Sequence, residues 1–149
     1  MAVSEDLLHW EKKGVILDAG SGREWDNSGR AISSLLCDVD VYGNRELIKY
    51  DGKYWMFYHA YPGVGYEVGA AANGLAWTTD ENLLEWHCEP EPVFEKDIAG
   101  CWDGGGLYST WIVPHDGMLW HFYYAVRPTE TEEEKQRFGS EYRCLTVAR

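Results

Sequence analysis

Apolar and aromatic residues gather in short runs that are separated by turn signals. The clearest runs are Tyr54–Ala60, Tyr108–Pro114 and Met118–Val126. Asp51-Gly52 precedes the first run and Asp116-Gly117 separates the other two, and Asp-Gly is favoured where a tight hairpin needs positive φ. No long segment keeps the 3.6-residue period of an amphipathic helix. The pattern therefore predicts an all-β chain whose strands are joined by hairpins.

Weaker patterns predict the remaining elements. Two prolines in Trp86–Phe94 favour an edge strand or an extended segment. Two segments could be helical, Ser4–Trp10 as a single turn and Glu130–Phe138 as a short surface helix. The other expected elements are strands over Leu47–Tyr50, Leu75–Thr79 and Arg143–Ala148 and a loop over Cys101–Gly106.

The chain repeats its own pattern in order. The segment Ser4–Trp10 returns as Thr79–Trp86, and Trp25-Asp26 returns as Trp102-Asp103, 77 residues later. The hairpin over Tyr50–Ala60 also returns, 65 residues later. The first copy thus carries about twelve extra residues after Asp26. We expect one domain, 1–149, with repeats over 1–75 and 76–149. Four strands in about 70 residues match a β-propeller blade, a four-stranded antiparallel sheet.

Composition narrows the class of partner. The formal net charge of −12 argues against a nucleic-acid backbone or an anionic membrane surface as partner. Aromatic residues make up 15% of the chain, with eight Trp and ten Tyr. Such flat, partly polar side chains serve in β-sheet packing or on a binding face, and the charge is compatible with a neutral ligand.

Cofactor and targeting signals are missing from the sequence. The four cysteines form no CxxC pair and no paired Cys/His spacing, so we expect no metal. Gly63-Val64-Gly65 does not fit the dinucleotide fingerprint, and no phosphate loop occurs, so we expect no cofactor. No charged-then-apolar leader opens the chain and no 18-residue apolar run exists, so the expected location is the cytoplasm.

At this point the residues resemble a known family. The segment SEDLLHW before KKGVIL, and the hairpin YDGKYWMFYHA, look like the five-bladed β-propeller glycoside hydrolases of families 43, 32 and 68, with relatives such as family 130. A complete propeller of that kind has about five blades, and this chain holds about two. The resemblance implies a portion of a longer enzyme whose first-blade acid precedes Met1. The alternative is a two-blade protein that closes a ring with copies of itself.

Glycoside hydrolysis needs two carboxyl groups that flank the scissile bond. Glu46, in Asn44-Arg45-Glu46-Leu47, looks like the family's Arg-Asp-Pro element, in which the acid binds sugar hydroxyls or stabilises the transition state. It could instead form an ion pair with Arg45 or Lys49. Asp26 and Asp103 each follow a tryptophan and precede small residues, and Asp103 is the better candidate of the two. A repeated Trp-Asp could equally cap a turn in every blade.

Aromatic and loop residues supply the candidate sugar subsites. The candidates for substrate binding are Arg45, Trp25, Trp102, Tyr108 and Trp111. Weaker candidates are Asp38 and Asp40 in the first-copy insertion, the strand histidines His59 and His121, and the loop Tyr61–Tyr66. For each of these a solvated loop or an ordinary hydrogen-bonded side chain is the simpler interpretation.

The sequence therefore predicts a glycoside hydrolase-like protein that cleaves glycosidic bonds in oligosaccharides. The rival is a non-catalytic carbohydrate-binding or scaffolding propeller module, in which the acids serve only as turn caps and hydroxyl ligands. A third hypothesis is a β-repeat protein whose aromatic faces hold an oligomer together. The expected partner is an oligosaccharide, with a homo-oligomer if the two-blade chain is complete.

Overall fold

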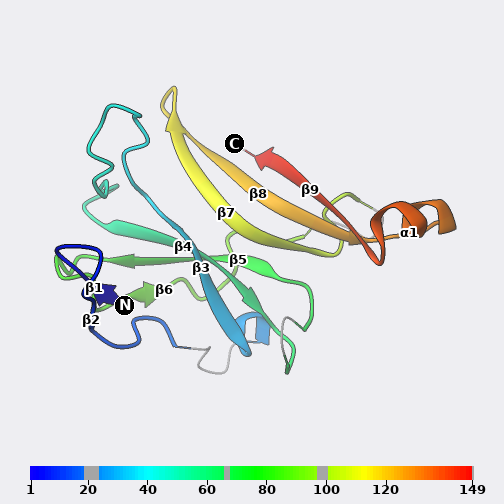
Figure 1. Cartoon of the computed structure of the whole chain (residues 1–149), viewed down its shortest axis with the longest axis horizontal. Coiled ribbons are helices and arrows are strands. Elements are labelled where there is room, and N and C mark those ends of the chain that lie inside the picture. Colours follow the sequence, from blue (N-terminus) through cyan, green and yellow to red (C-terminus); the bar gives the residue numbers. More distant parts are fainter. Residues whose placement is uncertain (19–23, 66–67, 97–100, 149) are drawn as a thin grey trace.

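A computed structural model describes residues 1–18, 24–65, 68–96 and 101–148, and within them the chain is all-β apart from two short helices (Figure 1). Two antiparallel sheets make up most of it. The first sheet has the strand order β3 (Gly29–Leu35), β4 (Tyr54–Tyr61), β5 (Ala72–Thr78), β6 (His87–Cys88). The second has the order β7 (Gly106–His115), β8 (Met118–Pro128), β9 (Glu141–Ala148). Neighbours in the sheet are neighbours in sequence, as in propeller blades.

Two small elements flank these sheets. A hairpin of β1 (Ala2–Val3) and β2 (Glu11–Lys12) lies near β6, and the 3₁₀ helix η1 (Glu24–Asp26) precedes β3 (Figure 1). The expected surface helix is α1 (Glu132–Phe138). It begins there because the Thr131 hydroxyl accepts a hydrogen bond from the backbone N–H of Glu134 at 3.1 Å, which satisfies an otherwise unpaired donor.

Both Asp-Gly hairpins are confirmed. Asp51 and Gly52 have φ of 51° and 72°, and Asp116 and Gly117 have φ of 50° and 72°. Positive φ at both central residues matches the right-handed twist of the flanking strands, which is why this dipeptide selects the turn. Each hairpin therefore follows directly from two residues.

The repeated turn before each outer strand is built in the same way twice. The indole of Trp10 donates to the carbonyl of Leu7 at 3.0 Å, and that of Trp86 donates to the carbonyl of Leu83 at 2.8 Å. Both leucines have positive φ, 65° and 58°. Aspartate side chains accept the nearby backbone N–H groups, so Ser4–Trp10 is a side-chain-capped turn and the expected helical turn is wrong.

Two expected strands are shorter in the structure. Leu47–Tyr50 forms only isolated bridges, Cys37 with Leu47 and Tyr50 with Lys53. On its side opposite β5, strand β4 pairs with β3 and not with Leu47–Tyr50. The segment Trp86–Phe94 keeps two strand residues and a bridge from Phe94 to Asn73, since its prolines cannot donate to a ladder.

The boundary between the two sheets does not coincide with the boundary between the two sequence repeats. β5 runs across residue 75, where one repeat passes into the next, and it pairs along its whole length with β4. The turn that opens the second repeat therefore completes the first sheet. The division between the sheets falls between β6 and β7.

The core lies on and between the sheets. Met56, Tyr58, Ala60 and Ala76 form one buried cluster on the first sheet. Leu107, Tyr123 and Ala125 form another on the second. β7 packs against β3, β4 and β5, so one face of the first sheet is covered by the second (Figure 1).

Candidate functional site

The start of β3 holds a buried ion pair. Asp26 is fully buried, and its Oδ2 accepts hydrogen bonds from Arg30 Nη2 at 2.7 Å and Arg30 Nε at 3.1 Å. Arg30 Nη1 also donates to the carbonyl of Asp18 at 2.8 Å. Burial is the largest single influence on Arg30 and by itself would lower the pKa, but the hydrogen bond and charge of Asp26, together with Cys88 and Tyr58, outweigh it and the pKa is raised. Asp26 therefore acts in this structure as the counter-ion of Arg30, not as an open acid.

Trp25 is packed into the first sheet. Its ring stacks on Tyr58 with centroids 5.8 Å apart and planes 18° apart. A Cβ at Gly74 would lie 2.5 Å from the Trp25 ring, so only glycine leaves room there. The indole N–H donates to the carbonyl of Pro90 at 3.0 Å. Trp25 also lines a surface hollow together with Pro62 and Lys96, but the ring face that stacks on Tyr58 is not available to a sugar.

Trp102 and Asp103 repeat this arrangement with two differences. The ring centroids of Trp102 and Tyr123, the counterpart of Tyr58, lie 6.0 Å apart. Unlike Trp25, however, Trp102 is 45% exposed. Asp103 is 4% exposed, and among the described residues its Oδ1 has no hydrogen-bond partner. At the 77-residue offset that relates Asp26 to Asp103, Leu107 stands where Arg30 would be. Asp103 thus lacks the arginine that neutralises its counterpart.

Beside this turn lies a cluster of rings at the junction of the two sheets. The ring centroid of His59 lies 5.6 Å from that of Tyr61 and 5.8 Å from that of Tyr108, and the two tyrosine centroids lie 5.9 Å apart. Ser33 Oγ lies 3.1 Å from His59 Nδ1. The predicted Tyr108 and the weaker candidate His59 are therefore brought together. Of the loop Tyr61–Tyr66, Tyr66 lies outside the described residues.

Sequence reasoning missed Ser33 and Arg30. Ser33 is the bulged residue where the β3–β4 register shifts, and a bulge leaves no mark in a hydrophobic pattern. Arg30 could have been found from its four-residue spacing to Asp26.

Glu46 and Arg45 lie at the opposite end of the first sheet. Both are exposed, in the loop that joins β3 to β4 (Figure 1). Backbone bonds place Glu46 opposite Asp38, beyond the end of β3, and the seven residues of β3 alone span about 23 Å. Acid pairs in glycosidases lie about 5 to 10 Å apart. The structure therefore does not bring Glu46 together with Asp26.

Other candidates have local roles. Asp38 Oδ1 accepts from the N–H of Asp40 at 2.9 Å, and Asp40 Oδ1 accepts from that of Tyr42 at 3.0 Å, so both shape the β3–β4 loop. Trp111 is 56% exposed on the face of β7 that points away from the first sheet. No group of three or more potential metal ligands occurs among the described residues. In the same residues, no helix is long and apolar enough to cross a membrane.

His121 is half-buried between the sheets. Its ring centroid lies 4.9 Å from that of Phe94 and 5.1 Å from that of Tyr123. Within the described chain its Nε2 has no hydrogen-bond partner. Burial lowers the pKa of His121 to about 4. The side chain is therefore neutral near pH 7 and acts as a packing residue.

A pH dependence of stability follows. The unfolded chain binds a proton at His121 near pH 6.5 and the folded chain only near pH 4, so stability falls as the pH drops through this window. Between pH 7 and pH 5 we expect His121→Met, which carries the residue found at the equivalent Met56, to lose about 1 kcal/mol less than the wild type, a figure reduced for partial exposure. Urea unfolding at both pH values measures this, with the exposed His115→Gln as control. Equal losses in His121→Met and wild type would contradict it.

Similarity to known proteins is found among solved structures. No protein-family model and no curated protein matches the chain. A solved structure described as a glycoside hydrolase is similar to it, with a TM-score of 0.77 and 23% sequence identity over 98% of this chain. A second, described as a complex of BT0996 and RGII, gives the same values. In both cases the match covers 43% of the other protein, so this chain spans less than half the length of either.

These similarities show that the chain shares the fold of part of those two proteins. The expected all-β architecture of propeller-like sheets is confirmed, with one sheet of four strands and one of three in the described residues.

Proposed function

We propose that this chain forms part of a glycoside hydrolase-like protein that binds oligosaccharides and cleaves their glycosidic bonds. Trp102-Asp103 carries the proposal. Trp102 offers a half-exposed ring for stacking on a sugar, and the adjacent Asp103 holds a buried carboxylate oxygen that has no partner among the described residues. A carboxyl group held in place beside a sugar-stacking ring is what a glycosidase uses to bind a hydroxyl or to transfer a proton.

The surroundings of Asp103 support this assignment. Lys96 Nζ donates to the carbonyl of Gly104 at 3.3 Å, and the N–H of Gly106 donates to the carbonyl of Asp103 at 3.2 Å, so the turn is held from both sides. Leu107 donates its N–H to the carbonyl of Ala71 at 2.9 Å, which ties the turn to the first sheet. Such a tightly held backbone keeps the Asp103 carboxylate in one position.

A non-catalytic carbohydrate-binding module is the second candidate. It is favoured by the ion pair of Asp26 with Arg30 and by the remote position of Glu46. Under this alternative the aromatic residues bind sugar and no second acid is needed. Product analysis separates the two candidates, because only the first releases new reducing ends from an oligosaccharide.

The Trp102→Ala substitution tests the shared element of both candidates. We expect it to weaken oligosaccharide binding about tenfold, the effect of losing one stacked ring. Isothermal titration with a panel of neutral and acidic plant and microbial oligosaccharides, RGII fragments included, measures the change. Trp10→Ala is the control, because Trp10 is also about half exposed, at 57%, but lies in the N-terminal turn. Equal affinity of wild type and Trp102→Ala for every bound sugar would count against the site.

A further inference from the structure

A surface hollow of about 330 Å³ lies between the two Trp-Asp turns. Trp25 of the first turn lines it, together with Pro62, Glu95, Lys96 and the alanines at 70–72. The second turn adjoins it, because Lys96 Nζ donates to the Gly104 carbonyl at 3.3 Å and the N–H of Leu107 donates to the Ala71 carbonyl at 2.9 Å. These lining residues lie within 25–96, so the hollow is built from the interior of the chain and not from either end.

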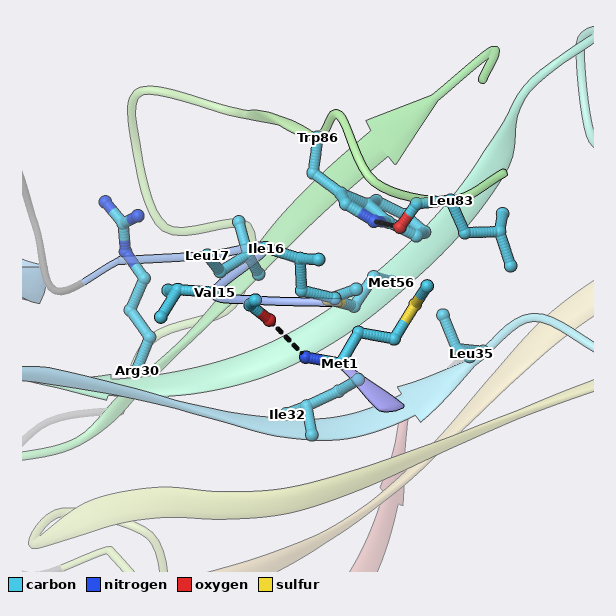
Figure 2. Close-up of a pocket in the computed structure, with 11 residues that line it drawn as sticks. Met1, Val15, Ile16, Leu17, Arg30, Ile32, Leu35, Met56, Leu83 and Trp86 are labelled. Atoms are coloured by element: carbon cyan, nitrogen blue, oxygen red, sulfur yellow. Dashed lines mark hydrogen bonds between the residues drawn. The ribbon is translucent and has the colours of Figure 1, made fainter. Parts of the chain in front are cut away.

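A larger groove of about 480 Å³ on the first sheet suits a sugar less well (Figure 2). Apolar side chains, Ile32 and Met56 among them, form most of its lining. The guanidinium of Arg30 reaches the groove but is held by Asp26 at 2.7 Å. The groove therefore offers a sugar little polar contact, and the hollow is the better candidate.

Lys96 is the cation of the hollow. Its Nζ donates to the Gly104 carbonyl, and it forms no salt bridge within the described residues. By contrast, Lys13, Lys49 and Lys135 each lie 2.6 to 2.7 Å from a carboxylate oxygen. An ammonium group that borders a hollow and that no carboxylate neutralises is placed to receive an anionic group of a ligand.

The rest of the lining fits a sugar ring that carries one carboxylate. Pro62 and the part of Trp25 that is not stacked on Tyr58 present apolar surface, on which the C–H face of a sugar can pack. Glu95 can accept hydrogen bonds from sugar hydroxyls, and Lys96 can pair with the carboxylate. The net charge of −12 repels a ligand with many negative charges. The ligand class is therefore a mainly neutral oligosaccharide with one acidic residue.

The hollow is close to Trp102. Lys96 contacts Gly104, which is two residues beyond Trp102, so the Cα atoms of Gly104 and Trp102 are at most about 7 Å apart. Neighbouring sugar residues in an oligosaccharide are spaced on a similar scale. One oligosaccharide can thus place a residue in the hollow and another on the Trp102 ring.

We propose that the hollow is a subsite for an acidic sugar residue, in which Lys96 pairs with the carboxylate and Glu95 accepts hydroxyl groups. This inference rests on the proposed carbohydrate function. It narrows the substrate class to oligosaccharides in which a carboxylated residue adjoins neutral ones.

Isothermal titration with matched trisaccharides tests the subsite. Each acidic trisaccharide contains one hexuronate residue, and its neutral partner is the same trisaccharide with that carboxyl group reduced to the alcohol. We expect the wild type to bind the acidic form about fivefold more tightly, the effect of one exposed ion pair. The preference should shrink at high salt. Equal affinity for the two forms overturns the proposal.

Lys96→Gln tests whether Lys96 supplies the charge. It should lower the affinity for the acidic form to that for the neutral form, and leave the latter unchanged. Lys12→Gln is the control, because it changes the net charge equally at an exposed lysine outside the hollow, and it should keep the preference. A preference that survives Lys96→Gln overturns the proposal. Equal losses for both forms also overturn it, because they show that Lys96 acts only by holding the Gly104 turn.

The Trp102→Ala variant distinguishes a failure of the subsite from a failure of the carbohydrate function. If the wild type binds both forms equally and Trp102→Ala weakens both, the carbohydrate site stands and the acidic subsite is overturned. If the wild type binds neither form of any trisaccharide, the subsite and the carbohydrate function fail together.

Discussion

Arg30→Leu is expected to lower the free energy of unfolding by about 3 to 5 kcal/mol. The substitution leaves the fully buried Asp26 carboxylate without the guanidinium that donates to it at 2.7 and 3.1 Å. An uncompensated buried charge costs far more than the hydrogen bonds alone. Urea unfolding at pH 7 followed by tryptophan fluorescence measures the loss.

Two further variants isolate the cause. The double variant Asp26→Asn/Arg30→Leu removes both charges and should recover a large part of the loss. Arg143→Leu breaks an exposed pair with Glu141, whose two side chains are 69% and 43% exposed, and should cost less than about 1 kcal/mol. A loss for Arg30→Leu no larger than that for Arg143→Leu would show that the pair does not act as described.

Under the proposed hydrolytic function, Asp103→Asn is expected to lower kcat at least about a hundredfold while KM changes little. The amide has nearly the shape of the carboxylate and keeps the packing, but it cannot transfer a proton. Loss of a single proton-transfer group is typically worth about 10²- to 10⁴-fold. Steady-state kinetics on a hydrolysed oligosaccharide measures the split between kcat and KM.

The control is Asp116→Asn, at a turn aspartate whose side chain is 87% exposed, and it should leave both constants unchanged. If Asp103→Asn instead raises KM at constant kcat, Asp103 binds a hydroxyl and takes no part in proton transfer. If the wild type binds sugars but releases no product, the binding module is the better description.

The sequence predicts best what is decided by adjacent residues. Asp51-Gly52 and Asp116-Gly117 each select a hairpin, and the aromatic runs that follow them are strands in the structure. β3 was missed because Gly29–Leu35 has no aromatic run and carries a bulge at Ser33. Its pairing with β4 across an 18-residue connection is a long-range contact that local patterns do not reveal.

The candidate site shows the same limit. The Trp-Asp repeat correctly indicated two equivalent turns, but the two aspartates differ in exposure and in the side chains around them. Asp26 forms an ion pair with Arg30 on the next strand, whereas the residue equivalent to Arg30 near Asp103 is Leu107. Glu46 directly precedes the predicted strand Leu47–Tyr50, yet in the structure it lies in the β3–β4 loop, at the opposite end of the first sheet from Asp26. Which end of a sheet a residue lies at depends on how its strand pairs with neighbouring strands, and a single sequence does not reveal that pairing.

The offset between repeats and sheets has a consequence for how such a chain can be divided or duplicated. A cut at residue 75 would split β5 and strip the first sheet of its outer strand, although it separates the two repeats cleanly in sequence. A cut between β6 and β7 leaves each sheet with all its own strands. Any gene segment that duplicates the repeat unit therefore joins neighbouring sheets covalently, with each unit providing the closing strand of the sheet before it.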